Sequence, residues 1–485
     1  MKSEVEQLGI KFDPSVKGMK SLDKAVFDTK VTLPCVVVDA TELAKILYML
    51  KPYLFKIRKL NSVMDYNDAC LVTNSVGLNE IDTKPQDTIA TDNKEYNVEG
   101  HKVKYNYDKK VILLNPKVIQ KFEDFGEFNV KVLENAKLTA KDFTHAEVLL
   151  TYDNFSAEDI LKAILPDNVA MSSFTSVGHI VHCNLREELI EHKFIIGRVL
   201  LDKVPSCETV VNKAHAIDNT YRNFQMELLA GKDCMVTMHK ENGCTFKMDF
   251  SKVYWNSRLS TEHERVTKEV REGDLVLDVF AGVGPFSIPA ARRGAIVAAN
   301  DLNPDSYAWL QASIRLNERQ VKTPISATQK DARDFLQTDA RAHLVRWSQS
   351  EGNSTGGTAV ARVIMNLPAT AVEYVRYLKV LTREEFGKLS RPPVLYLYCF
   401  LPKMDLETKK KIKCVQAAKE LFERNQLPFD ASKMKFHFVR DVAPNKDMYK
   451  IVVQLGEEYL VNDKRGAEEE EEEGRKKARL VEETE

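Results

Sequence analysis

The stretch LVLDVFAGVGPFSI (275–288) decides the fold of this chain. It begins as an apolar, β-branched run that ends in Asp278, turns at Gly282 and Gly284, and leads into a helix-like segment. A strand, a glycine turn and a helix in this order form the nucleotide-binding turn of doubly wound α/β sheets. Glycine is needed where the backbone approaches a ligand without a Cβ in the way. The stretch therefore predicts a ligand-binding turn at the carboxyl end of a parallel strand.

Similar apolar runs recur downstream and alternate with helical stretches, a pattern that indicates a parallel sheet buried on both faces. The expected strands lie at 275–281, 295–301, 324–330, 362–368 and 394–400, and the expected helices include 303–317 and 369–389. Two final strands, 435–442 and 448–455, are joined by the turn APNKD. We therefore expect an α/β fold: a Rossmann-like, doubly wound sheet with an antiparallel C-terminal hairpin strand at or near one edge.

Two residues of the glycine turn distinguish between classes of ligand. The third position of a dinucleotide-binding GxGxxG motif is Ser287 here, and Pro285 removes an amide that a pyrophosphate would bind. An acidic residue that leads into the turn, Asp278, suits a cationic ligand such as the ammonium and sulfonium groups of S-adenosylmethionine. These features disfavour a nicotinamide oxidoreductase and predict S-adenosylmethionine as the cofactor.

Polar residues also follow the next strands. Asp301 ends the second strand, where a carboxylate can accept from both ribose hydroxyls, and Asp331 follows the third, where it can accept from the adenine amino group. Each of them, taken alone, can equally be a helix cap. Because the carboxyl ends of parallel strands share one edge, the conjunction with Asp278 predicts a single ligand site.

The fourth strand ends in Asn366, which is followed by Pro368. An amide that donates and accepts can contact the substrate base, the cofactor or both, although a proline that merely ends a buried strand is the structural alternative. The segment resembles the Asn-Pro-Pro-aromatic signature of amino-methylating enzymes. Ala369 stands at the aromatic position, so stacking of a flipped base there is not carried over.

The residues before 251 show a different order of expected strands and helices. The segment 174–185 is strand-like, 186–201 is an amphipathic helix, and further strands are expected at 210–213, 224–231, 234–240 and 244–250. Residues 31–50 suggest a strand and then a helix, and 75–110 are loop-rich. We expect four parts: an N-terminal accessory domain (1–150), a small α+β domain (151–250), the sheet domain (251–460) and a charged, disordered tail (461–485).

Composition narrows the class of protein. The chain has 485 residues and no apolar run long enough to span a membrane. Its eight cysteines include no CxxC pair, and His179 and His182 share no face of a strand, so we expect reduced thiols and no metal. Residues 466–485 carry nine Glu against four Arg or Lys; removing that −5 from the chain's −1 leaves +4 elsewhere. A mild excess of this size is compatible with a local basic patch.

The expected location is the cytoplasm and nucleus. The first residues, MKSEVEQLGIKFDPS, fit neither a secretory signal nor a standard mitochondrial presequence. RKKAR (475–479) in the tail is either a nuclear import signal or a solvated charge run. The Ser/Gly-rich stretch 348–358 is an expected loop.

Six motifs together resemble the archaeal–eukaryotic tRNA (guanine-N1)-methyltransferases that modify position 37. They occur in that family's order and cover about residues 165–455; the resemblance is thin over 1–150. The motifs are GHIVHCNLR (178–186), YRNFQMELLAG (221–231), KVYWNSRLSTEHERV (252–266), DVFAGVGPFSIPAA (278–291), NDLNP (300–304) and MNLPA (365–369). The resemblance implies a class I methyltransferase that uses S-adenosylmethionine, binds tRNA as a monomer and supports reading-frame maintenance; a mitochondrial pool is also implied. It further implies that domain 1–150 engages tRNA and that domain 151–250 contributes to binding of the tRNA and the target base.

The resemblance also implies roles for single residues. Arg222 would contact the guanine O6, Glu262 would take the N1 proton, Asn366 would belong to both the catalytic and the cofactor site, and Tyr254 would lie beside the cofactor. The cofactor contacts would be His263, Asp301, Leu302, Asp331, Ala332 and Asn366, in addition to Asp278, Gly282, Gly284 and Pro368 from the strand-end pattern. Without the resemblance, each residue also has a purely structural interpretation. Arg222 could be half of a surface ion pair, Glu262 an acid in the first turn of a helix, and His263 a histidine hydrogen-bonded within the protein at a domain edge.

The chemistry fits these roles. Guanine N1 is protonated at neutral pH, so methyl transfer needs a base that removes this proton and a hydrogen-bond donor that stabilises the charge moving onto O6.

The sequence leaves three alternative functions open. They are a class I methyltransferase for another RNA position or for protein, a non-catalytic tRNA-binding protein, and the disfavoured oxidoreductase.

Overall fold

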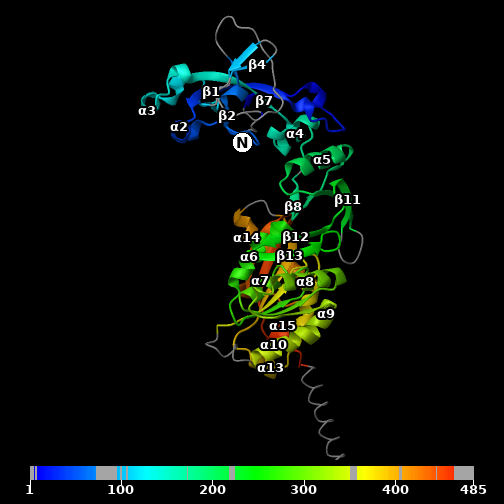
Figure 1. The fold of residues 1–485 in the computed structure, drawn as a ribbon. Coiled ribbons are helices and arrows are strands. Elements are labelled where there is room, and N and C mark those ends of the chain that lie inside the picture. The colour runs from blue at the N-terminus through cyan, green and yellow to red at the C-terminus, as the bar shows by residue number, and fades with distance from the viewer. Residues whose placement is uncertain are drawn as a thin grey trace, which may run out of the picture. The chain divides into compact units, whose positions relative to one another are not determined.

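The computed structural model describes Val5 and residues 8–72, 95–98, 101–104, 108–171, 173–217, 224–349, 358–403, 407–443 and 445–463. The chain forms two compact units, drawn in Figure 1. Unit 1 comprises Met1–Ser173 and Leu185–Pro205, and unit 2 comprises Phe174–Asn184 and Ser206–Glu485. The expected boundaries at 150 and 250 do not coincide with this division, because residues 151–250 are shared between both units.

Unit 1 is built on a five-stranded antiparallel sheet in the order β2-β6-β1-β7-β3. Its strands are β1 (Thr29–Asp39), β2 (Val63–Asp65), β3 (Cys70–Val72), β6 (Lys109–Leu113) and β7 (Phe143–Leu150), with a separate hairpin β4 (Glu95–Val98) and β5 (His101–Lys104). Its helices are α2 (Leu43–Leu50), α3 (Glu127–Asn135), α4 (Ala157–Ile164) and α5 (Lys193–Lys203). The expected strand and helix over 31–50 are confirmed as β1 and α2. Most of the expected loop-rich segment 75–110 lies outside the described residues.

Unit 2 contains a seven-stranded sheet in the order β16-β15-β14-β17-β18-β20-β19. The strands are β14 (Leu275–Asp278), β15 (Ile296–Asn300), β16 (Ile325–Thr328), β17 (Ala361–Met365), β18 (Val394–Pro402), β19 (Met434–Ala443) and β20 (Lys446–Gln454). The first five are parallel, and β20 is antiparallel to both β18 and β19. The expected doubly wound sheet is confirmed, with its antiparallel strand next to the edge.

Alternating side chains bury the sheet on both faces. Leu275 and Leu277 of β14 join one core cluster, whereas Val276 between them joins the other. One face is covered by α6 (Ser260–Glu269), α7 (Ser287–Arg292) and α8 (Pro304–Asn317). The other is covered by α9 (Ala332–Phe335), α10 (Arg341–Ser348), α12 (Ala371–Tyr374), α14 (Glu407–Arg424) and α15 (Glu457–Leu460). Two faces of apolar contact explain why the strands are continuous apolar runs in the sequence.

Three local expectations need correction. The segment 174–185 is a hairpin of β8 (Thr175–Val177) and β9 (Ile180–Cys183), because Gly178 turns with φ +57° where a Cβ would collide with Thr237 and the Met238 carbonyl. The expected helix 186–201 starts as a 3₁₀ helix, Glu187–His192, before α5. The expected helix 369–389 is broken into α12, the 3₁₀ helix Val375–Leu378 and α13 (Arg383–Gly387).

The other upstream strands pack within unit 2. The hairpin β8–β9 extends into a four-stranded sheet through β10 (Thr209–Ile217) and β11 (Phe224–Gly231). The expected strands around Glu-Asn-Gly form the hairpin β12 (Val236–Glu241) and β13 (Cys244–Asp249). Asn317 of α8 donates to the Thr245 carbonyl at 2.7 Å and accepts from the Thr245 amide at 2.9 Å, so this hairpin is held directly against the large sheet's helix layer. Residues 350–357 of the expected Ser/Gly loop and the tail from 464 onward lie outside the described residues.

Candidate active site

The glycine turn after β14 is fixed by hydrogen bonds to the end of β15. The Gly282 amide donates to Asp301 Oδ2 at 2.8 Å, and the Ala281 amide donates to the Asn300 carbonyl at 2.8 Å. Gly282 has φ +55°, with open space around a hypothetical Cβ, whereas Gly284 has φ +95° and its Cβ would come within 2.7 Å of Leu310. Gly284 is therefore required by the contact of the turn with α8, a packing reason that the sequence did not reveal.

Asp278 ends β14 with no exposed surface. Ser287 donates its hydroxyl to Asp278 Oδ2 at 2.6 Å, and Oδ1 has no hydrogen-bond partner within the described part of the chain. Burial raises the pKa of the Asp278 carboxyl to about 7, with the nearby Asp301 carboxylate adding to the rise and Ser287 opposing it. A buried carboxylate with one unused oxygen is suited to a cationic hydrogen-bond donor.

Asp301 follows β15 and is also enclosed. Its Oδ1 accepts from the Asn303 amide at 2.9 Å, while Oδ2 holds the Gly282 amide. Burial raises the pKa of this carboxyl, against the effect of those backbone hydrogen bonds. Asn303, not Asp301, caps α8, because its side chain accepts from the Asp305 amide. The helix-cap alternative therefore does not account for Asp301.

Asp331 does cap a helix. It is the N-cap of α9 and accepts from the Arg333 amide at 2.8 Å, and the Arg333 guanidinium donates to both carboxylate oxygens at 2.9 and 3.0 Å. The Arg333 side chain accordingly lowers the pKa of Asp331. The next residue, Ala332, is buried, and Leu302 after Asp301 is 43% exposed.

Asn366 follows β17, with its Oδ1 buried and without a hydrogen-bond partner among the described residues. In the sheet register Asp278 lies between Ala299 of β15 and Ile364 of β17. Residues at or just after the ends of four neighbouring strands therefore meet at one edge: Asp331, Asp301, Asp278 and Asn366. The Pro368 carbonyl accepts from the Phe400 amide at 3.3 Å, which ties the segment after β17 to β18.

This donor and acceptor set fits S-adenosylmethionine. Two buried oxygens on adjacent strands, Asp278 Oδ1 and Asn366 Oδ1, have no partner in the described chain and call for donors from a ligand. Ammonium, ribose hydroxyl and adenine amino groups are such donors. Asp278, Asp301, Asp331 and Asn366 would hold the cofactor, and the chemistry it would supply is an activated methyl group on a sulfonium.

The predicted base, Glu262, lies on α6 with 5% of its surface exposed. Arg265 donates from Nε to Glu262 Oε2 at 2.7 Å and contacts the same oxygen through Nη2. Tyr398 donates its hydroxyl to Oε1 at 2.7 Å, and the Lys450 ammonium lies 3.2 Å from the same atom. Glu262 is thus more than a first-turn helix acid, since a buried network from β18 and β20 surrounds it.

Three other predicted residues lie in different settings. His263 is buried, with Nδ1 at 2.6 Å from Glu241 Oε1 and its ring 4.7 Å from that of Phe286, so its side chain has partners within the protein. Tyr254 is 52% exposed and is therefore available to a ligand. Arg222, the predicted O6 donor, lies outside the described residues.

Several residues of this region were not predicted from sequence. Ser287 binds Asp278, Arg333 binds Asp331, Glu241 binds His263, and Tyr398 and Lys450 contact Glu262. In the sequence Ser287 stands out only as a departure from the dinucleotide motif, because its bond to Asp278 depends on how the turn between β14 and α7 folds. Arg333 stands two residues after Asp331, whereas Glu241, Tyr398 and Lys450 come from strands distant in the sequence and leave no local signal.

The described ranges contain neither a cluster of metal ligands nor a membrane-spanning helix. No group of three or more His, Cys, Asp or Glu side chains there could hold a metal ion. The His182 ring packs on Phe250 at 5.1 Å between centroids, while His179 Nδ1 lies 3.1 Å from Thr237 Oγ1. No helix in those ranges has the length and apolar character needed to cross a bilayer.

The fold and the strand-end site define a class I methyltransferase that uses S-adenosylmethionine as its cofactor. Residues 237–387 match the TRM5/TYW2 methyltransferase domain and residues 157–234 match the TYW2 N-terminal domain. The tRNA (guanine(37)-N(1))-methyltransferase of Aedes aegypti is 39% identical over 449 residues, which are 92% of this chain and 70% of that protein. The protein of the same name from Danio rerio is 37% identical over 444 residues, 91% of this chain and 83% of that protein. The chain therefore belongs to the tRNA (guanine(37)-N(1))-methyltransferase family.

Solved structures agree on the fold. Trm5b from Pyrococcus abyssi superposes with a TM-score of 0.51 at 22% identity, over 87% of this chain and 99% of that one. The complex of aTrm5 with tRNALeu gives a TM-score of 0.50 at 20% identity with the same coverage. At these identities the likeness establishes the architecture.

Proposed function

We propose that this chain transfers the methyl group of S-adenosylmethionine to N1 of guanosine 37 in tRNA, next to the anticodon. The observation that carries the proposal is the set of four polar residues at or just after the ends of β16, β15, β14 and β17, with two buried oxygens that lack partners in the described chain. Family membership supports the choice of reaction, because the relatives from Aedes aegypti and Danio rerio bear that name.

In this proposal Glu262 removes the N1 proton and Arg222 stabilises the charge that moves onto O6. Asn366 lies at the cofactor edge and can contact the target base through its amide group as well. Asp278, Asp301 and Asp331 orient the cofactor, with Gly282, Gly284, Leu302, Ala332 and Pro368 shaping the edge and Tyr254 and His263 beside it. A base in the anticodon loop leaves its stack at lower cost than a base within a duplex.

The test is transfer of a labelled methyl group to unmodified tRNA transcripts that differ only in carrying G or A at position 37. We expect label on the G37 transcript alone, located at N1 after nuclease digestion. Label on the A37 transcript, or on a different guanine, would replace this proposal with methylation at another RNA position.

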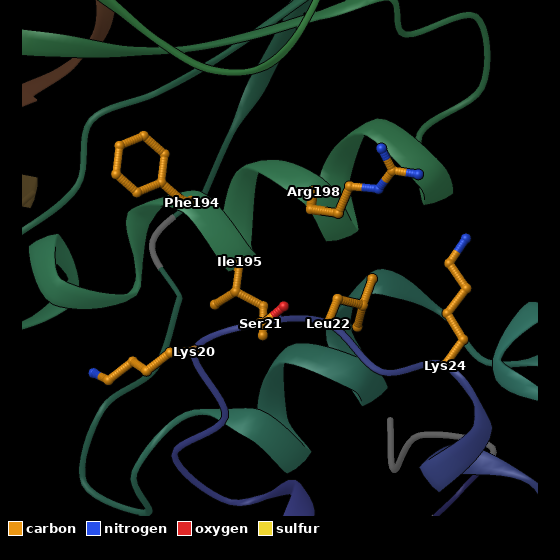
Figure 2. Close-up of a pocket in the computed structure, with 7 residues that line it drawn as sticks. All are labelled: Lys20, Ser21, Leu22, Lys24, Phe194, Ile195 and Arg198. Atoms are coloured by element: carbon orange, nitrogen blue, oxygen red, sulfur yellow. The ribbon is translucent and has the colours of Figure 1, made fainter.

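We further propose that unit 1 helps to engage tRNA without taking part in the chemistry. A hollow there is bordered by three cationic residues, Lys20, Lys24 and Arg198, beside the 58% exposed Phe194. Figure 2 shows Phe194, Ile195 and Arg198 projecting from α5 and the residues of 20–24 on the facing segment. Lys20 is paired with the exposed Glu191, and Lys24 and Arg198 are paired with the partly buried Asp202; RNA phosphates could take the place of these acids.

Charge reversal at Lys20 and Lys24 tests this role. The double variant should raise the KM for tRNA several-fold while the affinity for S-adenosylhomocysteine stays at the wild-type value. If the double variant and the wild-type protein had the same KM for tRNA over a range of salt concentrations, the hollow would not be part of the tRNA-binding surface.

The cellular setting is also a proposal: a monomer in the cytoplasm and nucleus, with a mitochondrial pool. Support comes from the eight cysteines, all free thiols, as expected in a reducing compartment, and from the basic RKKAR segment. Light scattering on the purified chain tests the oligomeric state. Imaging of the tagged chain with and without RKKAR tests nuclear import.

A further inference from the structure

The two oxygens of Glu262 have different surroundings. Oε1 faces the interior, where the Tyr398 hydroxyl donates at 2.7 Å and the Lys450 ammonium lies at 3.2 Å. Both partners are fully buried. Oε2 faces Arg265, whose side chain is 37% exposed. One oxygen is therefore held by the sheet, and the other lies toward the more accessible side.

The interior anchor is rigidly built. Tyr398 of β18 and Lys450 of β20 are direct partners in the antiparallel register, so the two strands present both groups to the same point. Leu397, the residue before Tyr398, pairs with Met365, which immediately precedes Asn366. The anchored oxygen thus lies near the carboxyl edge of the sheet, where the cofactor-binding residues also gather.

We propose that Tyr398 and Lys450 are positioning residues that anchor Oε1 of Glu262, so that Oε2 is the atom that accepts the guanine N1 proton. This inference rests on the proposed function. In the step, the N1–H bond breaks, an O–H bond forms at Oε2, and the electron pair of the N–H bond stays on N1. Arg265 covers Oε2 in this structure and leaves it when the base enters, a movement that its exposed position permits.

Lys450 acts mainly through its charge. Its ammonium makes no hydrogen bond of good geometry within the described chain, yet it lies 3.2 Å from Glu262 and 3.7 Å from Glu269. Among the described residues, the charged and titratable groups around Glu262 are Arg265 of α6, Tyr398 of β18 and Lys450 of β20, with His437 of β19 within electrostatic range. Glu269 lies on the far side of Lys450 and accepts from Tyr396. Removal of a buried cation beside a buried carboxylate favours the protonated carboxyl, which cannot act as a base.

The sequence offers a matched pair of variants to test the anchor. Tyr398 and Tyr396 lie on the same strand and the same face, and each donates to a glutamate of α6, but Tyr396 bonds Glu269 at 2.5 Å instead of Glu262. Tyr398→Phe should lower the single-turnover rate at neutral pH about 10-fold and move the acid limb of the rate–pH profile to higher pH. Tyr396→Phe should leave both at their wild-type values.

Lys450→Met should move the acid limb in the same direction and further, while the affinity for S-adenosylhomocysteine is retained. If this variant does not fold, Tyr398→Phe decides the question alone. Tyr398→Phe and Tyr396→Phe with the same rate and the same acid limb would overturn the inference. The proposed function fails separately, if wild-type protein places no methyl group on N1 of guanosine 37.

Discussion

The Gly282 amide donates to Asp301 Oδ2 at 2.8 Å, so the turn after β14 is closed by the carboxylate that follows β15. The same carboxylate accepts from the Asn303 amide through Oδ1. Asp301 therefore fixes the glycine turn, in addition to its expected contact with the ribose hydroxyls. Its two tasks make it the most informative residue for testing the cofactor site.

Asp301→Ala should weaken binding of S-adenosylhomocysteine about 10- to 150-fold, the range expected for lost hydrogen bonds to a charged group. Binding of tRNA should remain nearly intact. Calorimetric titration measures the first quantity and filter binding the second. Asp305→Ala, at a half-exposed acid of the first turn of α8, is the control. Unchanged cofactor affinity in Asp301→Ala would remove this residue from the site.

Glu262→Gln should lower the single-turnover rate about 10²- to 10⁴-fold, because the amide keeps its size but cannot accept the N1 proton. Affinity for cofactor and tRNA should persist. The residual rate should rise with pH as guanine ionises without help. Glu264→Gln is the control on the same helix, since Glu264 pairs only with the exposed Lys268 at 2.8 Å among the contacts described. If Glu264→Gln lowered the single-turnover rate and Glu262→Gln left it at the wild-type value, the base would be assigned to the wrong residue.

Asp278→Asn should stabilise the protein without cofactor at pH 8 while weakening its affinity for cofactor. Burial raises the pKa of Asp278 from 3.8 to about 7. Between these values the folded protein keeps a proton that the unfolded chain has lost, so stability falls as pH rises through this window. The asparagine avoids this loss, which is at most about 4 kcal/mol at roughly 1.4 kcal/mol per pKa unit. Urea unfolding at pH 4 and pH 8 should show a gain at pH 8 only; equal gains at both would refute the explanation.

Asp331→Ala should remove the preference for adenine. Wild-type protein should bind S-adenosylhomocysteine more tightly than S-inosylhomocysteine, since the latter lacks the amino group that Asp331 would accept from. In the variant the two ligands should bind alike, with about a 10-fold loss for the adenine compound. Asp334→Ala, in the first turn of α9, is the comparison. If Asp331→Ala still bound S-adenosylhomocysteine more tightly than S-inosylhomocysteine, another residue would recognise the adenine amino group.

The sequence predicted best what local pattern determines. The apolar runs that became β14, β17 and β18 are buried on both faces. Asp278, Asp301, Asp331 and Asn366 stand at or just after strand ends along one edge, because parallel strands share their direction. Turn chemistry was predicted equally well for the β12–β13 hairpin at Glu-Asn-Gly.

Contacts between distant segments could not be predicted. Tyr398 reaches Glu262 across 136 residues, and Lys450 stands in an apolar strand where its charge gives no indication of its partner. The packing need for Gly284 depends on the Leu310 side chain of another helix. The break in the expected helix 369–389 likewise follows tertiary packing, with Val375 and Leu378 of its 3₁₀ turn buried.

The division of the chain also constrains how it is made by the ribosome. Unit 1 includes Leu185–Pro205, which follows Phe174–Asn184 of unit 2. Helix α5 in that returning segment buries Ile195, Ile196, Val199 and Leu200. Although domains often fold in the order of their synthesis, the N-terminal unit here is incomplete until translation has passed Pro205. A nascent chain stalled at residue 173 would expose the apolar surface that α5 later covers, and would be a substrate for chaperones.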